Sequence, residues 1–94
     1  MAEKLSSSEI RQQLAAAAGW KGRDRRKSIV RTYSFPDFRC ALAFVGYVGE
    51  LSESLNHHPD IDIRYNRVTL ALSTHDAGGL TAKDFQLAGL VDGR

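Results

Sequence analysis

The sequence is poor in cysteine, in long apolar stretches and in net charge, which argues against disulfide-bonded, membrane-spanning and nucleic-acid-binding proteins. Its single cysteine, Cys40, cannot form an internal disulfide, so we expect a reducing compartment, the cytoplasm. The longest apolar stretch, Ala41–Val48, is interrupted by Gly46 and is too short to cross a membrane. Residues 1–6 lack the apolar segment of a signal peptide. A net charge of only +2 gives no argument for a nucleic-acid partner.

What remains is the composition of an ordinary folded domain. The 94 residues are 43% hydrophobic and 26% charged, which predicts one small domain over residues 1–94. One local run, Lys21–Lys27, is strongly basic. We interpret it as a solvated loop between two strands, because no aromatic residue lies within it. A phosphate-binding patch is the alternative.

Two sequence patterns predict where helices begin. Ser6 is followed by Glu9 three residues later, as in a capping box, and the helix should run to about residue 18, where Gly19 stops it. Thr81 and Asp84 repeat the pattern near the end of the chain, with aspartate in place of the usual glutamate. A second helix is predicted between these two.

This second helix begins at Pro36–Asp37 and continues to Leu55. Its apolar residues form two adjacent stripes that together cover about half of the helix circumference or more, wider than one sheet face requires. The excess indicates either a contact between subunits or burial by the other two helices. The sequence favours neither.

Alternating residues predict a β-hairpin within the segment Pro59–Thr74. Ile61 and Ile63 alternate with polar residues before Asn66, and Val68 and Leu70 do so after it. The apolar side chains share one face if Ile61 pairs with Leu70 and Ile63 with Val68, because a slip of one residue turns a strand over. The turn is then at 65–66, where Asn66 tolerates a positive φ.

Two further extended segments complete the sheet. A short strand begins near Trp20, and a longer one, Ser28–Phe35, is rich in β-branched and aromatic residues. The element order is α-β-β-α-β-β-α. It predicts an α+β fold with a four-stranded antiparallel sheet and three helices packed on one face.

The hairpin register also predicts that three histidines meet. Continued beyond the strands, the pairing places His58 opposite Ser73 and His57 opposite Thr74, and His75 is the next residue. The chain has no other histidine. Because imidazole exchanges protons near neutral pH, such a cluster is suited to general acid–base catalysis.

The sequence around these histidines resembles the pterin-4a-carbinolamine dehydratase family. That family's motif combines an acidic residue, two histidines, a proline, an aromatic residue, a third histidine and an aspartate. Here the positions are filled, over 32 residues, by Glu53, His57, His58, Pro59, Tyr65, His75 and Asp84. A weaker resemblance runs from Gly19 to Val91, which is most of the chain.

The resemblance implies a hydro-lyase, 4a-hydroxytetrahydrobiopterin dehydratase. Such an enzyme removes water from a 4a-hydroxytetrahydropterin and forms quinonoid dihydropterin, in tetrahydrobiopterin recycling beside an aromatic amino-acid hydroxylase. The implied protein is a homodimer or homotetramer and uses no metal or cofactor, since the pterin is the substrate.

The resemblance also implies roles for individual residues. His57, His58 and His75 would be catalytic. The residues that would bind the pterin are Asn56, His57, His58, Ser73, Thr74, His75 and Asp76. The supporting residues would be Glu53, Pro59, Tyr65 and Asp84. The backbone of Ser73 and Thr74 could bind the pterin edge like an added strand.

Some of these assignments have alternatives. Glu53 is equally consistent with a solvated helix residue, whereas for Asp84 we favour a simple helix cap, because Leu80 and Phe85 fit the accompanying staple. A zinc site is disfavoured because adjacent His57 and His58 do not easily bind one ion from an extended backbone. A binding role without catalysis is another alternative, since the resembled family has members in animals that also serve as dimerisation partners of a homeodomain transcription factor. Another pterin, for example in molybdopterin metabolism, is a further alternative substrate.

Overall fold

The predicted order of helices and strands is confirmed. The computed structural model describes residues 3–93. In chain order the elements are α1 (Ser7–Ala16), β1 (Lys21–Arg23), β2 (Ser28–Ser34), α2 (Phe38–Leu55), β3 (Asp60–Arg64), β4 (Arg67–Leu72), η1 (His75–Ala77) and α3 (Ala82–Val91). The 3₁₀-helix η1 was not predicted. The basic run, interpreted as a loop, contributes its first three residues to β1 and only the rest to a turn.

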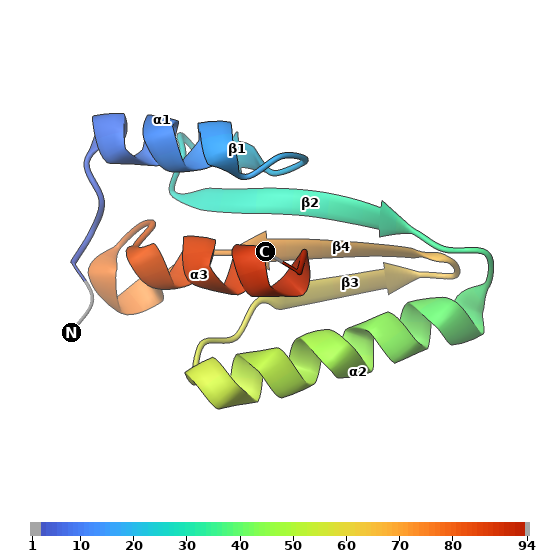
Figure 1. The fold of residues 1–94 in the computed structure, drawn as a ribbon. Coiled ribbons are helices and arrows are strands. Elements are labelled where there is room, and N and C mark those ends of the chain that lie inside the picture. The colour runs from blue at the N-terminus through green and yellow to red at the C-terminus, as the bar shows by residue number, and fades with distance from the viewer. Residues whose placement is uncertain (1–2, 94) are drawn as a thin grey trace.

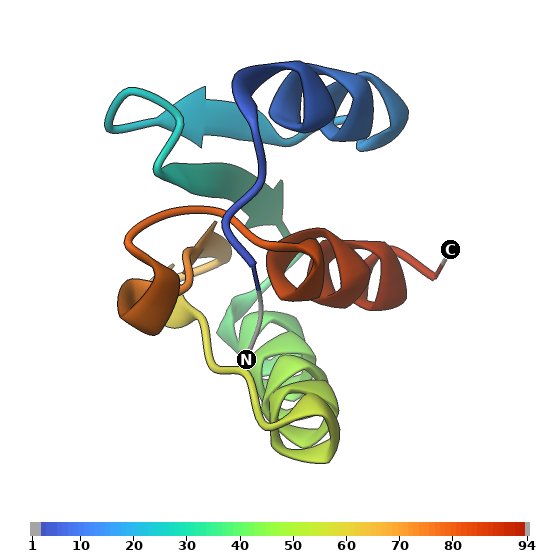
Figure 2. The same cartoon turned by 90° about the vertical axis from the view of Figure 1, so that its left-hand side faces the viewer.

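The four strands form one antiparallel sheet in the order β1-β2-β4-β3, with all three helices on the same face (Figures 1 and 2). The side chains of β2 and β4 that point toward the helices form the centre of the core. Those exposed by no more than 1% are Ile29, Val68, Leu70 and Leu72. On the opposite face the Thr32 and Thr69 hydroxyls lie 2.8 Å apart. In the described part of the chain no helix covers that polar face (Figure 2).

The helix starts follow the predicted caps. At α1, the Glu9 N–H donates to Ser6 Oγ (3.2 Å) and the Ser6 N–H donates to Glu9 Oε1 (2.8 Å). The bond from the Ser6 backbone lowers the pKa of the Glu9 carboxyl group. At α2, the Cys40 N–H donates to Asp37 Oδ1 (2.8 Å), which lowers the pKa of Asp37. Local hydrogen bonds therefore position both helix starts.

The β3–β4 hairpin has the predicted register. Ile61 pairs with Leu70 and Ile63 with Val68, so the apolar residues share the face that carries the helices. The predicted turn conformation was wrong in one respect. The left-handed backbone is at Tyr65 (φ 51°) and not at Asn66. This asparagine instead uses its side-chain amide to donate to the Phe35 carbonyl (2.9 Å), which ties the hairpin tip to the end of β2.

A largely buried carboxylate near the C-terminus links the end of α3 to Trp20 and β2. Asp92 accepts hydrogen bonds from Trp20 Nε1 (2.8 Å), Tyr33 Oη (2.5 Å) and Arg31 Nη1 (3.0 Å). Trp20 is only 5% exposed and belongs to the core. The first helix ends at Ala16, two residues before the predicted end. Gly19, with φ of 89°, then turns the chain so that the Trp20 indole enters the core.

The apolar surface of α2 is only partly covered by the other helices. Ala41 and Val48 are fully buried, but Phe38, Leu42 and Tyr47 are each 44–48% exposed. Burial by α1 and α3, one of the two explanations left open by the sequence, therefore does not account for the whole apolar surface. A substantial apolar area remains on the helix and requires another explanation.

Candidate active site

The three histidines lie around one hollow at the end of the hairpin. Asn56, the C-cap residue of α2, has a left-handed backbone (φ 51°), which directs the chain from the helix into His57 and His58. His75 begins η1, shortly after β4 ends. The hollow has a volume of about 230 Å³, and all seven predicted pterin-contacting residues line it: Asn56, His57, His58, Ser73, Thr74, His75 and Asp76.

The histidines reach this hollow by a different route from the predicted one. The β3–β4 ladder ends at Asp60 and Ala71, so the pairing predicted for His57 and His58 is wrong. Pro59 has no N–H to donate to a continuing ladder. The residues before it are therefore placed by the end of α2 and not by the sheet.

The backbone of Thr74, expected to bind the pterin edge, is already used within the protein. Its N–H donates to the Gly79 carbonyl (3.0 Å), and its own carbonyl accepts from Ala77 N (3.1 Å) and Gly79 N (3.3 Å). These bonds close the loop that carries η1. An added-strand contact at Thr74 would have to break these bonds, so the Thr74 backbone is not free to bind the pterin edge.

A buried carboxylate anchors His57. Asp84 Oδ1 lies 2.6 Å from His57 Nε2, and Asp84 Oδ2 accepts from Thr74 Oγ1 (2.9 Å) and the Thr81 N–H (2.9 Å). Asp84 is 0% exposed and His57 is 9% exposed. An ionised carboxylate only accepts hydrogen bonds, so this geometry places the imidazole proton of His57 on Nε2 and leaves Nδ1 free of it in the neutral ring.

Asp84 is both a helix cap and the partner of a histidine. Its bond to the Thr81 N–H is the cap predicted for α3, and its second oxygen holds His57. The Thr74 hydroxyl donates its only hydrogen to Asp84, so the Thr81 hydroxyl, 2.8 Å away, must donate to Thr74. The helix cap and the contact with the histidine are therefore made by the same carboxylate.

His58 has a different partner and a more open environment. Its Nε2 lies 2.5 Å from Glu53 Oε2, in the last turn of α2. The side chains are 55% and 76% exposed. Glu53 is therefore solvated and also paired with a histidine. An exposed pair of this kind is worth about 0–1 kcal/mol, so it orients the ring with little effect on stability.

The remaining predicted residues are divided between the hollow and other sites. His75 and Asp76 are exposed and line the hollow. Among the described residues the His75 ring has no hydrogen-bond partner, so both its nitrogens are open to a ligand. Pro59 connects His58 to β3. Tyr65, 68% exposed, lies at the hairpin tip, at the opposite end of the strands from the histidines.

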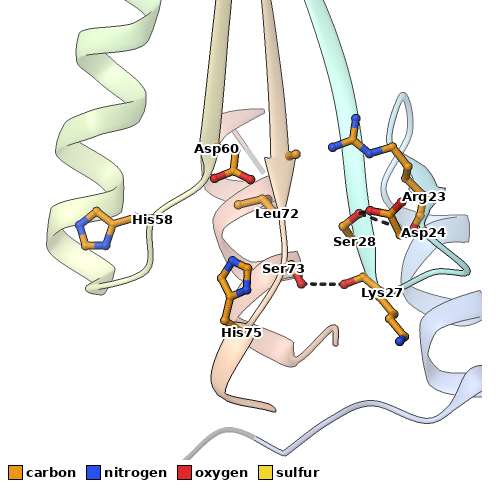
Figure 3. Close-up of a pocket in the computed structure, with 10 residues that line it drawn as sticks. Arg23, Asp24, Lys27, Ser28, His58, Asp60, Leu72, Ser73 and His75 are labelled. Atoms are coloured by element: carbon orange, nitrogen blue, oxygen red, sulfur yellow. Dashed lines mark hydrogen bonds between the residues drawn. The ribbon is translucent and has the colours of Figure 1, made fainter. Parts of the chain in front are cut away.

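A second hollow lies beside the first and was not predicted. It has a volume of about 200 Å³ and shares His58, Ser73 and His75 with the first hollow. Figure 3 shows its other wall, which includes Arg23 at the end of β1 and Lys27 in the β1–β2 turn. The basic run was a visible signal for these residues. Only the pairing of β2 with β4, which the sequence did not establish, brings that run beside the histidines.

Candidate metal-binding clusters and membrane-spanning helices are both absent from the described residues, 3–93. No three histidine, cysteine, aspartate or glutamate side chains are grouped so that they could hold a metal ion. No helix is both long enough and apolar enough to span a membrane.

Comparison with known proteins establishes the family. Residues 3–93 match the family model described as pterin 4 alpha carbinolamine dehydratase. A protein of Chloroflexus aurantiacus is 55% identical over 89 residues, which cover 95% of this chain and 94% of that protein. A protein of Roseiflexus sp. strain RS-1 is 51% identical over 94 residues, covering 98% and 97%. Both are named, provisionally, as pterin-4-alpha-carbinolamine dehydratases. The chain belongs to this family.

Solved structures show the same fold. A transcriptional coactivator/pterin dehydratase from Brucella melitensis superposes with a TM-score of 0.92 at 35% identity, and the match covers 97% of each chain. A pterin dehydratase-like protein described as a RuBisCO assembly factor of the alpha-carboxysome has a TM-score of 0.69 at 21% identity, covering 80% of this chain and 87% of that one. The second likeness shows the fold alone.

Proposed function

We propose that this protein dehydrates a 4a-hydroxytetrahydropterin to quinonoid dihydropterin, in the recycling of tetrahydrobiopterin beside an aromatic amino-acid hydroxylase. The observation that carries the proposal is the single hollow lined by His57, His58 and His75 in a chain of the dehydratase family. The protein itself supplies groups that can both give and take a proton at neutral pH.

The reaction needs one proton donor and one proton acceptor. The bond between C4a and the hydroxyl oxygen breaks, and that oxygen takes a proton and leaves as water. The neighbouring ring nitrogen loses its proton, and the electron pair of that N–H bond forms the new C=N bond. The elements of water are lost and no redox step occurs, so a suitable acid and base are sufficient.

The two paired histidines fit these two roles. His57 presents Nδ1 as an acceptor while Asp84 holds its Nε2 proton, and the buried carboxylate would stabilise the imidazolium that forms. We therefore assign His57 as the base. His58, whose Nε2 lies against the Glu53 carboxylate at the exposed side of the hollow, is assigned as the acid. The unpartnered ring of His75 is assigned to hold the pterin.

A dehydration assay tests the proposal directly. The 4a-carbinolamine is generated in solution, and the formation of quinonoid dihydropterin is followed by absorbance with and without the purified protein. We expect a rate well above the spontaneous one and proportional to the protein concentration. A rate that does not change on addition of the folded protein would reject the function.

Substitution of His58 should lower the dehydration rate much more than substitution of Glu53. We expect His58→Ala to lower kcat by about 10²–10⁴, the usual contribution of a general acid or base. Glu53→Gln should cost less than about tenfold, because an exposed ion pair contributes little. Glu50→Gln, an exposed acid on the same helix outside the hollow, is the matched control. An unchanged rate in His58→Ala would reject its assignment as the acid.

We propose that the protein self-associates through α2 as a homodimer or homotetramer. Members of this family are commonly oligomeric, and Phe38, Leu42 and Tyr47 remain exposed on α2 in the single chain. We expect Leu42→Glu to lower the molar mass measured by light scattering to that of a monomer. Ser54→Glu, at an exposed position of the same helix, should leave the mass unchanged. If both variants keep the wild-type mass, this face is not the interface.

A further inference from the structure

The second hollow continues from the histidines across the open face of the sheet. His58, Ser73 and His75 belong to both hollows, so a ligand seated among the histidines has a direct path into this space. Figure 3 shows Arg23 and Lys27 on the far side of it from His58. A substituent on the ligand ring would therefore extend toward the β1–β2 turn.

Two cations, Arg23 and Lys27, line the far wall of this hollow and belong to the basic run. Residues 21–27 contain five lysines and arginines and one aspartate. Within the described residues neither Arg23 nor Lys27 forms an ion pair. Two carboxylates also line the hollow: Asp24, in the same turn, and Asp60, which lies on the side of the histidines (Figure 3). The cations thus outnumber the acids at the far wall and are available to a ligand.

The β1–β2 turn has an unusual backbone conformation, and Ser73, which lines both hollows, hydrogen-bonds to its last residue. Asp24, Arg25 and Arg26 have φ values of 54°, 56° and 63°, and three successive non-glycine residues with left-handed backbones are uncommon. The Ser73 hydroxyl donates to the Lys27 carbonyl (2.7 Å), so the strand that leads to His75 also fixes the end of this turn. Such a conformation persists where surrounding contacts determine it, which is frequent at ligand sites.

We propose that Arg23 and Lys27 bind an anionic substituent, a phosphate or a carboxylate, on the pterin whose ring lies among the histidines. A guanidinium and an ammonium group give charge-assisted hydrogen bonds to such an anion. The inference rests on the proposed function for the identity of the ring, and it adds a class of substrate: pterins with a negatively charged side chain.

The kinetic test compares carbinolamines that differ only in the side chain. One carries a phosphomonoester, one a carboxylate and one a neutral hydroxyl, and the measured quantity is the ratio of kcat/KM for each anionic substrate to that for the neutral one. Arg23→Gln combined with Lys27→Gln should lower the ratio for the preferred anion by about ten- to a hundredfold. The anion with the larger loss identifies whether phosphate or carboxylate is recognised.

The control variant removes the same charge from two neighbouring residues of the basic run. Arg25 and Arg26 do not line the hollow, so Arg25→Gln combined with Arg26→Gln should change the ratio by less than about twofold. A ratio that is unchanged in the Arg23/Lys27 variant would overturn the inference. An equal loss in both double variants would also overturn it, since the general field of the turn and not contact would then be responsible.

A binding measurement separates this inference from the proposed function. Calorimetric titration with a stable pterin that carries a phosphomonoester or a carboxylate, and with its neutral counterpart, needs no turnover. If no carbinolamine is dehydrated, the proposed function fails. The anion site is still supported if Arg23→Gln/Lys27→Gln binds the anionic pterin about tenfold or more weakly than the wild-type protein. A loss of that size is expected when charge-assisted hydrogen bonds are removed. Equal affinity in the variant and the wild-type protein overturns the anion site even if dehydration is observed.

Discussion

Replacement of His57 by alanine is expected to lower kcat for carbinolamine dehydration by about 10²–10⁴, the range for loss of a positioned base. The substitution removes the only group in the hollow whose ring is held by a buried carboxylate, at 2.6 Å. It also leaves one oxygen of Asp84 without its partner, so we expect a loss of about 1–3 kcal/mol in the free energy of unfolding. Stopped-flow absorbance and urea unfolding measure the two effects.

A second substitution separates catalysis from folding. His57→Gln keeps an amide N–H that can donate to Asp84 but cannot accept and release a proton at neutral pH. We expect it to recover most of the lost stability and none of the lost rate. If His57→Gln, or folded His57→Ala, turns over within about threefold of the wild-type rate, less than any general base contributes, His57 is not the base.

The Asp84→Asn variant should be as slow as the histidine variants although it leaves all three imidazoles in place. An asparagine has only one acceptor oxygen. That oxygen takes the place of Asp84 Oδ2, because the Thr81 N–H and the Thr74 hydroxyl both donate to Oδ2. Its NH₂ group then faces His57 Nε2 and forces the proton of the ring onto Nδ1, which removes the acceptor from the hollow. We expect kcat to fall about 10²–10⁴ with a smaller change in KM.

Asp92→Asn is the matched control for this experiment. Asp92 is also a largely buried carboxylate, with bonds to Trp20, Arg31 and Tyr33, but it lies outside both hollows. Both asparagine variants should lose about 1–3 kcal/mol of unfolding free energy, and only Asp84→Asn should lose the rate. Equal activity in the two variants would show that Asp84 supports the fold and not the base.

Much of the fold could be predicted because its signals are local. The pairing of Ile61 with Leu70 followed from alternation alone, since only one register places all apolar residues on one face. The capping pair Ser6 and Glu9 lies within a single turn of helix. The errors are also local. The left-handed residue of the hairpin turn is Tyr65, against the preference of its asparagine neighbour, because that asparagine bonds to β2.

The gathering of the histidines was predicted, but through an incorrect mechanism. The strand ladder stops before Pro59, and the left-handed backbone of Asn56 brings His57 and His58 to the hollow instead. The conclusion survived because a hairpin brings the two chain ends at its open side together even where they are not paired. The position of Tyr65 shows the limit of motif matching, since it occupies a motif position and lies at the far end of the hairpin.

The sequence by itself determined the element order and the hairpin register, because hydrophobic alternation and caps act over a few neighbouring residues, and the family resemblance supplied the set of residues expected around the histidine hollow. Only the tertiary structure decided which carboxylate holds which histidine and where the basic turn lies. His57 and Asp84 are 27 positions apart, and Ser73 and Lys27 are 46 apart. Such contacts depend on how α3 packs and on the pairing of β2 with β4, which no local pattern specifies.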